Sequence, residues 1–288
     1  MTHIRDLLAA GRTYSFEFFP PRSDEAAREL EKTIGELEPL RPSFVSVTYG
    51  AAGSTRELTR EVVVHIERDT SMTAMAHLTC IAHTRDELAG IIDGYRDAGI
   101  HNLLALAGDP PKDRHDYPHD LEHAIDLVRL IRSRGEFSVG VAAHPEGHPR
   151  SPDRDSDRRH LAAKLAEADF GITQFFFEAH HYVRMMDELA DLGCDTPVIP
   201  GIIPVTNARQ VQRFAELAGA EFPPALAARF EAVADDPAEV RRIGVELATT
   251  LCAELLELGV PGLHFYTLNR SSATREIYAN LGLGRGQR

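Results

Sequence analysis

A single carboxylate interrupts an aromatic run near the start of the chain. Residues 15–19, Ser-Phe-Glu-Phe-Phe, are predicted to form a β-strand that two prolines end. Alternation along this strand places Glu17 on the face opposite Phe16 and Phe18, so we expect its side chain in or at the mouth of an apolar interior. A carboxylate there is costly unless it is paired, hydrogen-bonded or protonated. Two interpretations stay open: a buried glutamate satisfied by a neighbouring donor, or a catalytic proton donor.

Other polar residues recur where apolar stretches of the sequence end. These positions are Thr48, His77, Asp109, His144, Gln174 and Arg270. Taken singly, each has an ordinary explanation, as a turn residue or as a core histidine with its hydrogen bonds satisfied. Gln174 is harder to explain in this way because it lies among phenylalanines, and a buried amide needs partners that a ligand heterocycle could supply. Together the residues predict a binding site more strongly than any one of them does.

The elements that would position these residues alternate between strand and helix. Short apolar strands are predicted at residues 15–19, 44–49, 73–80, 103–107, 137–143, 172–177, 198–203 and 263–267. Each is followed by a helical stretch, and this regular alternation predicts a parallel sheet. Eight such units in 288 residues predict an α/β protein of the (β/α)₈ TIM-barrel type, one domain over residues 1–288. An open doubly wound sheet is the alternative, but no Gly-x-Gly-x-x-Gly motif follows a predicted strand.

A barrel of this type carries its chemistry at the carboxyl ends of its strands, and the polar residues fall there. Two long connections, residues 109–120 and 144–156, lie at the same end. Loops of this length at the active end usually cover a ligand or move. Their proline content predicts shaped walls more than floppy lids.

Composition and residue types exclude several classes of protein. The formal net charge of −13 argues against nucleic acid or an anionic membrane as a partner. No apolar run approaches the length of about 20 residues that spans a membrane, and no leader segment is recognisable, so we expect a soluble, cytoplasmic protein. Three cysteines far apart in the sequence indicate neither a disulfide framework nor a thiolate metal cluster. The histidines of residues 144–148 are metal-capable, but the intervening prolines favour a loop wall, and we expect no metal site.

Eight blocks, one near the end of each predicted strand, carry a family resemblance. They are residues 16–21 (FEFFPP), 45–50 (VSVTYG), 77–80 (HLTC), 108–109 (GD), 145–149 (PEGHP), 172–177 (ITQFFF), 199–202 (IPGI) and 264–270 (HFYTLNR). In this order they closely resemble the 5,10-methylenetetrahydrofolate reductase family. The resemblance runs over almost the whole chain and covers the catalytic barrel of that family, without the regulatory domain of its larger members.

The resemblance implies reduction of 5,10-methylenetetrahydrofolate to 5-methyltetrahydrofolate with a nicotinamide dinucleotide as donor. Glu17 matches the family's general acid, which protonates the folate as its five-membered ring opens to a 5-iminium cation. Asp109 matches the acid that contacts the pterin and favours the cation electrostatically. The positions that match substrate contacts are Gln174, Gln210, Phe214 and Arg270.

The departures from the family concentrate at its FAD contacts. The cofactor-contact positions correspond to Thr48, His77, Ala107, Gly108, His144, His148 and Lys164. Ala107 stands where most members have an arginine, and His144 stands where they have a tyrosine. The stretch before residue 170 that grips the flavin phosphates is shortened and altered. An anionic dinucleotide that loses an arginine loses one of its stronger anchors.

These departures favour an enzyme that holds FAD weakly or not at all and passes hydride directly from NADH to the iminium carbon. The nicotinamide would then lie where the isoalloxazine usually lies, with Ala107 making room for it. Alternatives are an FAD-dependent ping-pong version of the same reaction, a related pterin reductase with a deazaflavin donor, and a non-catalytic folate-binding protein. The choice between NADH and NADPH stays open, as does the formation of a homo-oligomer.

Overall fold

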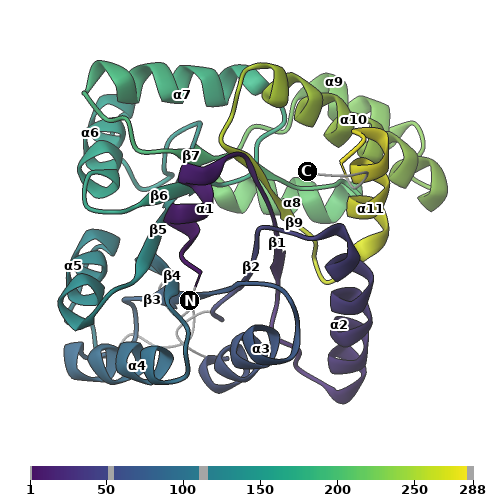
Figure 1. The fold of residues 1–288 in the computed structure, drawn as a ribbon. Helices are drawn as coiled ribbons and strands as arrows, with labels where there is room; N and C mark the ends of the chain where they lie inside the picture. Colours follow the sequence, from purple (N-terminus) through teal and green to yellow (C-terminus); the bar gives the residue numbers. More distant parts are fainter. Residues whose placement is uncertain (1, 51–54, 110–115, 284–288) are drawn as a thin grey trace.

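The computed structural model describes residues 2–50, 55–109 and 116–283, and in them a ring of parallel strands forms the centre (Figure 1). The strands are β1 (Thr13–Phe18), β2 (Phe44–Val47), β3 (Ala74–Thr79), β4 (Asn102–Leu106), β5 (Ser138–Ala143), β6 (Phe170–Thr173), β7 (Val198–Ile199), β8 (Gly201–Ile202) and β9 (Gly262–Tyr266). They pair in the order β7-β6-β5-β4-β3-β2-β1-β9-β8. Because β7 and β8 are consecutive in the chain, the sheet nearly closes, and the predicted TIM-barrel fold is confirmed.

Helices surround this ring on the outside (Figure 1). They are α2 (Asp24–Leu37), α3 (Arg56–Asp69), α4 (Arg85–Asp97), α5 (Ala124–Arg134), α6 (Arg154–Leu165), α7 (Ala179–Asp191), α8 (Ala208–Ala218), α9 (Pro224–Glu231), α10 (Pro237–Glu257) and α11 (Ser271–Asn280). Phe16 and Phe18 pack outward into the large core between strands and helices, as their alternation with Glu17 predicts. No helix in the described ranges is long and apolar enough to cross a membrane.

The predicted seventh strand, residues 198–203, is wrong as one continuous strand because Pro200 divides it. Proline has no backbone N–H, so it cannot donate to a neighbouring strand. The segment before it, β7, pairs with β6, whereas β8 pairs with β9. The carbonyl of Pro200 still accepts a hydrogen bond from His264 N at 3.0 Å. Residues 198–202 therefore pair with β6 on one side and with β9 on the other.

The predicted sixth strand, residues 172–177, also needs correction, since β6 ends at Thr173. Gln174 makes one more sheet-like bond, its N–H donating to the carbonyl of Ala143 at 2.7 Å. The Gln174 side-chain Oε1 then accepts from the N–H of Phe175 at 3.0 Å, which turns the backbone away from the ladder. Gln174 therefore lies just beyond the carboxyl end of β6.

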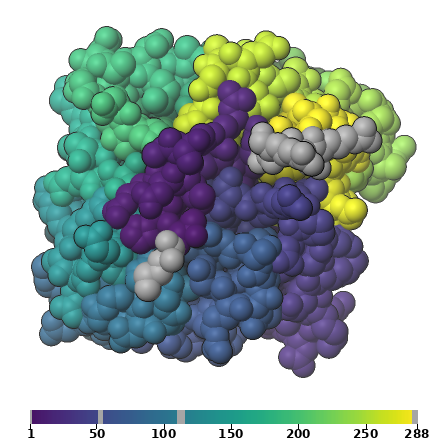
Figure 2. All heavy atoms as spheres, in the orientation of Figure 1, coloured from purple at the N-terminus to yellow at the C-terminus, as the bar shows by residue number. Residues whose placement is uncertain are grey.

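Helix α1 (Ile4–Ala10), which was not predicted, closes the amino-terminal end of the barrel (Figures 1 and 2). Ile4 is fully buried and belongs to the cluster inside the ring that includes Phe44, Met75 and Phe170. Its N–H donates to Oδ1 of Asn102 at 2.9 Å. With this end filled, a ligand has access to the barrel interior from the carboxyl ends of the strands.

Replacing Ile4 with alanine should remove part of this inner cluster and lower the free energy of unfolding by about 2–5 kcal/mol. Chemical denaturation followed by circular dichroism measures the change. Leu258→Ala is the matched control because Leu258 is 53% exposed, and we expect a change within about 0.5 kcal/mol there. Equal stability of Ile4→Ala and the unmodified protein would show that α1 is not part of the core.

Candidate active site

Glu17 lies inside the barrel near the carboxyl end of β1 and is 6% exposed. Its Oε2 atom lies 3.5 Å from Ser46 Oγ on β2, 3.5 Å from His77 Nε2 on β3 and 3.5 Å from His264 Nε2 on β9. The parallel register places Glu17 beside Ser46 on one side and beside Tyr266 on the other. Side chains from four strands therefore gather around one carboxyl group.

These contacts hold the Glu17 carboxyl group only loosely. Distances of 3.5 Å lie at the long limit of hydrogen bonding. Burial lowers the pKa of His77 to about 4, so its imidazole is neutral at neutral pH. Within the described part of the chain, no lysine or arginine forms an ion pair with Glu17. The site thus gives this carboxyl group polar neighbours but no permanent cation.

The backbone around Glu17 is held far more tightly than its carboxyl group. Thr267 Oγ1 donates to the carbonyl of Glu17 at 2.6 Å. The Asn269 side chain accepts from the N–H of Phe19 at 2.8 Å and donates to its carbonyl at 2.9 Å. Leu268 and Asn269 both adopt left-handed backbone conformations, with φ of 52° and 55°, a geometry that asparagine tolerates well. The turn after β9 therefore fixes the end of β1.

His264 and Ser46 are site residues that the sequence reasoning missed. His264 is fully buried, with Nδ1 2.8 Å from Ser15 Oγ and its ring stacked on Phe44 at 6.0 Å. Both residues point inward by the same alternation that places Glu17. Strand alternation applied to every predicted strand could have found them, but their approach to Glu17 depends on the register between strands.

The next predicted positions lie after β2 and β4. Thr48 is half-buried, and its N–H donates to the carbonyl of Phe18 at 2.9 Å. Gly108 has a φ of 84°, and a Cβ atom there would lie 2.5 Å from Cγ2 of Ile81, so only glycine fits. Ala107 is half-buried and Asp109 is exposed. The predicted connection 109–120 lies partly outside the described residues, which stop at 109 and resume at 116.

The connection after β5 is held against the start of α6 by two buried side chains. Arg158 is buried and donates to the carbonyls of His144 at 3.0 Å and Pro145 at 2.5 Å. Asp157 accepts from the N–H of His148 and from the hydroxyl of Ser151, both at 2.9 Å. An ion pair of 2.5 Å joins Asp157 to Arg158. This buried pair at the start of α6 holds the loop backbone in place.

The histidines of this wall are neutral at neutral pH, and its cations include Lys164 and Arg150. Burial lowers the pKa of His144 to about 3, and burial also lowers the pKa of His148. Both imidazoles are therefore neutral near pH 7. Burial lowers the pKa of Lys164 to about 8, and its Nζ donates to the carbonyl of Ala142 at 2.6 Å. Arg150 reaches across the wall to the carbonyl of Gly108 at 3.5 Å.

Two of the predicted folate contacts lie on helix α8. Gln210 and Phe214 are one turn apart on the same face of α8, the first exposed and the second half-buried. Phe214 packs against the apolar cluster that contains Phe175, with Tyr266 packed against the same cluster. This cluster brings α8 to the strand ends where Gln174 and Glu17 lie.

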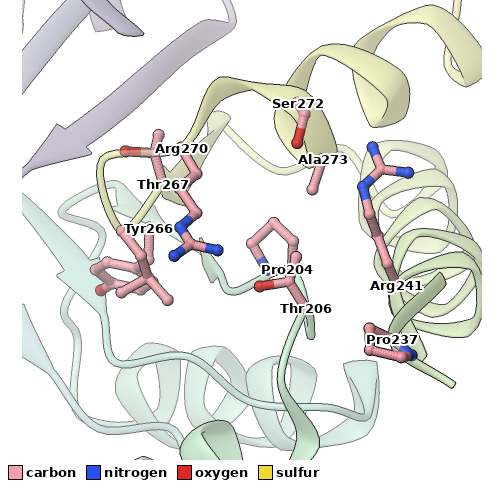
Figure 3. Close-up of a pocket in the computed structure, with 10 residues that line it drawn as sticks. Pro204, Thr206, Pro237, Arg241, Tyr266, Thr267, Arg270, Ser272 and Ala273 are labelled. Atoms are coloured by element: carbon pink, nitrogen blue, oxygen red, sulfur yellow. The ribbon is translucent and has the colours of Figure 1, made fainter. Parts of the chain in front are cut away.

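A cavity of about 220 Å³ opens beside the end of β9 (Figure 3). Its lining residues are Pro204, Thr206, Pro237, Arg241, Tyr266, Thr267, Leu268, Arg270, Ser272 and Ala273. Arg270 and Arg241 face it from two sides, and Arg241 also pairs with Glu276 at 2.7 Å. Thr267, which binds the Glu17 carbonyl, is part of the wall. Arg270 was predicted and Arg241 was not, since Arg241 lies in the middle of a helical stretch.

Comparison with known proteins agrees with the family resemblance of the sequence blocks. The family model described as methylenetetrahydrofolate reductase matches residues 3–282. The 5,10-methylenetetrahydrofolate reductase of Escherichia coli K12 is 40% identical over 274 residues, covering 94% of this chain and 91% of that protein. The protein of the same name from Pectobacterium carotovorum is 38% identical over 270 residues, covering 93% and 90%.

The chain belongs to the methylenetetrahydrofolate reductase family. The residues matched by the model of this reductase family span every strand of the barrel. Among solved structures, an uncharacterized protein from Clostridium thermocellum, described as binding two copies of 5-methyl-5,6,7,8-tetrahydrofolic acid, superposes with a TM-score of 0.66. It covers 98% of this chain and 97% of its own at 14% identity, which supports the fold of this family member.

Buried His77 should make the stability of this reductase-family protein fall in mild acid. Its pKa is about 4 when folded against an ordinary value of 6.5, so between these values the unfolded chain binds the proton that the folded chain does not. His77 alone should then lower the free energy of unfolding by about 1.4 kcal/mol per pH unit as the pH drops through this range. Denaturant titrations from pH 7.5 to 4.5 measure the slope, and His77→Gln should make it shallower. An identical slope in the variant would contradict the burial of a neutral imidazole.

Proposed function

We propose that this protein reduces 5,10-methylenetetrahydrofolate to 5-methyltetrahydrofolate with a nicotinamide dinucleotide as the hydride donor. Family membership supports the reaction. The observation that carries the proposal is the place of Glu17, a buried carboxyl group at the carboxyl end of the barrel with no cationic partner among the described residues. Such a group can give up a proton to a bound substrate.

In the proposed reaction, Glu17 donates a proton to the leaving nitrogen of the folate five-membered ring. The bond between that nitrogen and the methylene carbon breaks, and the electrons of the other ring nitrogen form a carbon–nitrogen double bond, which is the 5-iminium cation. Hydride from the dihydronicotinamide adds to the iminium carbon and yields the methyl group and the oxidised dinucleotide. Solvent returns the proton to Glu17. Asp109 stabilises the cation electrostatically, as a fixed negative charge does where positive charge develops.

The folate is proposed to lie between the end of β6 and helix α8. Gln174 uses its Oε1 atom on Phe175 N–H, which leaves its NH₂ group for an acceptor on the pterin. Gln210 and Phe214 supply an amide and an aromatic ring from α8. A folate also carries an anionic glutamate tail, and the cavity faced by Arg270 and Arg241 offers two guanidinium groups to its carboxylates.

The residues at the family's FAD positions fit a tightly held flavin dinucleotide poorly. A diphosphate needs cations or several N–H donors. Ala107 supplies no charge, His144 and His148 are neutral near pH 7, and the buried Arg158 is committed to Asp157 and to carbonyl groups. The Nζ atom of Lys164 also already donates a hydrogen bond to a carbonyl group. We therefore propose direct hydride transfer from NADH to the iminium carbon, with the nicotinamide beside the small side chain of Ala107.

Replacing Glu17 with glutamine should lower kcat by roughly 10²–10⁴-fold, because the amide keeps the size of the side chain but cannot donate the proton. Oxidation of NADH in the presence of 5,10-methylenetetrahydrofolate measures the rate and separates this reaction from that of a deazaflavin-dependent pterin reductase. Glu25→Gln on the exposed face of α2 is the matched control and should retain full activity. Unchanged turnover in Glu17→Gln would show that Glu17 is not the proton donor.

The purified protein should show no flavin absorption in the visible range, and adding FAD should not raise its rate of NADH oxidation. Ala107→Arg should strengthen FAD binding by about tenfold or more, since a charge-assisted bond to phosphate contributes about 1.5–3 kcal/mol. Fluorescence quenching of FAD measures both affinities. A stoichiometric flavin that is lost together with activity on stripping would defeat the proposal of direct transfer.

A further inference from the structure

Carboxylates and imidazoles from three separate segments converge at the rim beyond α7, outside the proposed reaction site. One group of donors is Glu178, His180 and His181, and a second is Glu146, His181 and Glu221. Within each group, one possible ligand atom per residue lies within 4.8 Å of the others. The two groups share His181, which therefore stands at the centre of five metal-capable side chains.

These side chains come from different parts of the chain. Glu146 lies in the wall after β5, His181 in the first turn of α7, and Glu221 between α8 and α9. The N–H of Glu221 donates to Oε2 of Glu146 at 2.7 Å, so two of the segments already touch. The same oxygen lies 4.0 Å from His181 Nε2. These side chains therefore lie close together because of the tertiary fold, and not because they are neighbours on one helix.

Three carboxylates gather here, and the guanidinium of Arg154 approaches them through the carbonyl of Glu146, at 3.5 Å. In the described ranges, no lysine or arginine forms an ion pair with Glu146, Glu178 or Glu221. The nearby Arg154 is instead bound to Glu188 at 2.7 Å. Glu146 and His181 are also partly buried, with side-chain exposures of 13% and 15%.

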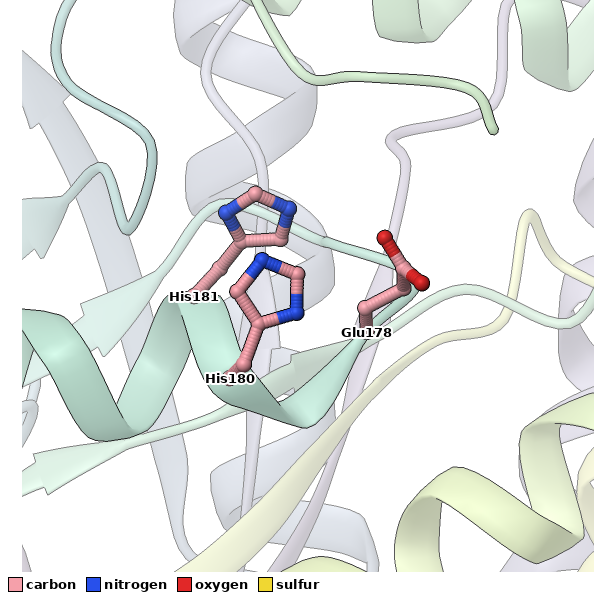
Figure 4. A group of neighbouring side chains, drawn as sticks. All are labelled: Glu178, His180 and His181. Carbon is pink, nitrogen blue, oxygen red and sulfur yellow. The ribbon is translucent and has the colours of Figure 1, made fainter. Parts of the chain in front are cut away.

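Glu178 and His180 stand at the edge of this group. Glu178 is the N-cap residue of α7, yet its carboxylate makes no capping hydrogen bond to the helix. The rings of His180 and His181 lie 3.9 Å apart, with the Glu178 carboxylate beside them (Figure 4). A carboxylate that is not used for capping, next to two imidazoles, is available as an additional ligand.

We propose that Glu146, His181 and Glu221 bind a divalent transition-metal ion of the zinc class, with Glu178 or His180 completing its coordination. Imidazole nitrogen with carboxylate oxygen is a donor set that Zn²⁺ accepts, at bond lengths of about 2.0–2.2 Å. Ligands on one such ion lie roughly 3–4 Å apart, so the present spacing requires only small side-chain rotations. The ion neutralises the carboxylates that lack a cation.

A metal ion at this position would join two walls of the opening. The segment with Glu146 also carries His144 and His148, and the segment with Glu221 follows the helix that carries Gln210 and Phe214. Cross-linking them fixes the spacing between the proposed nicotinamide side and the proposed folate side. The proposal concerns metal binding alone, so its test does not depend on whether the protein has the proposed reductase activity.

The test uses untagged full-length protein treated with a chelator and then titrated with Zn²⁺ by calorimetry, and with Co²⁺ by visible absorption. We expect one ion per chain at micromolar affinity and an increase in Tm with Zn²⁺. His181→Asn and Glu221→Gln should each weaken binding by about 10–100-fold. His160→Asn, on the exposed face of α6, is the matched control and should bind as the unmodified protein does. Circular dichroism confirms that each variant is folded.

Three results would overturn the proposal. One is no binding of Zn²⁺ at micromolar concentrations by the unmodified protein. Another is unchanged affinity in both His181→Asn and Glu221→Gln, which would place the ion elsewhere. The third is binding that His180→Asn abolishes but Glu221→Gln leaves intact, which would confine the ion to the first turn of α7.

Discussion

The structure depends on one costly group, the carboxyl group of Glu17 inside a barrel of mostly apolar side chains. A carboxyl group removed from water loses favourable hydration, and hydrogen-bond or ionic partners normally replace it. Here the neighbours are Ser46, His77 and His264 at 3.5 Å, and His77 is neutral. The barrel tolerates this arrangement because the backbone on either side of Glu17 is held by Thr267 and Asn269 and by two neighbouring strands.

The remainder of the fold is arranged around that carboxyl group. Helix α1 fills the amino-terminal end of the barrel, leaving the carboxyl ends of the strands as the route to the interior. Around that route, the buried Arg158–Asp157 pair fixes the wall after β5, and the cluster containing Phe175 positions α8. Two arginines face the cavity beside β9, while the histidines of the wall after β5 are neutral.

Much of the barrel could be predicted from the sequence because local signals agreed with the global fold. Alternation placed Glu17 inside and Phe16 outside, and strand–helix alternation gave the parallel ring.

The elements that were not predicted correctly have physical causes. Helix α1 has only seven residues, so the helical spacing of Ile4, Leu7 and Leu8 is too short a pattern to predict a helix. Pro200 divides a stretch that is apolar throughout, and Gln174 ends a strand through its own side chain.

Contacts between distant segments could not be predicted in the same way. The approach of Ser46 and His264 to Glu17 depends on the register between strands, and the group around His181 depends on how two loops and the start of α7 come together. Arg241 belongs to the cavity wall because of where α10 packs, which its position within a helical pattern does not indicate.

The most direct test of the central claim is a crystal structure of the Glu17→Gln protein with 5,10-methylenetetrahydrofolate bound. The account predicts the leaving ring nitrogen within hydrogen-bond reach of residue 17, about 2.6–3.2 Å, and the glutamate tail toward Arg270. A pterin bound elsewhere on the barrel, with residue 17 making no contact to it, would contradict the account.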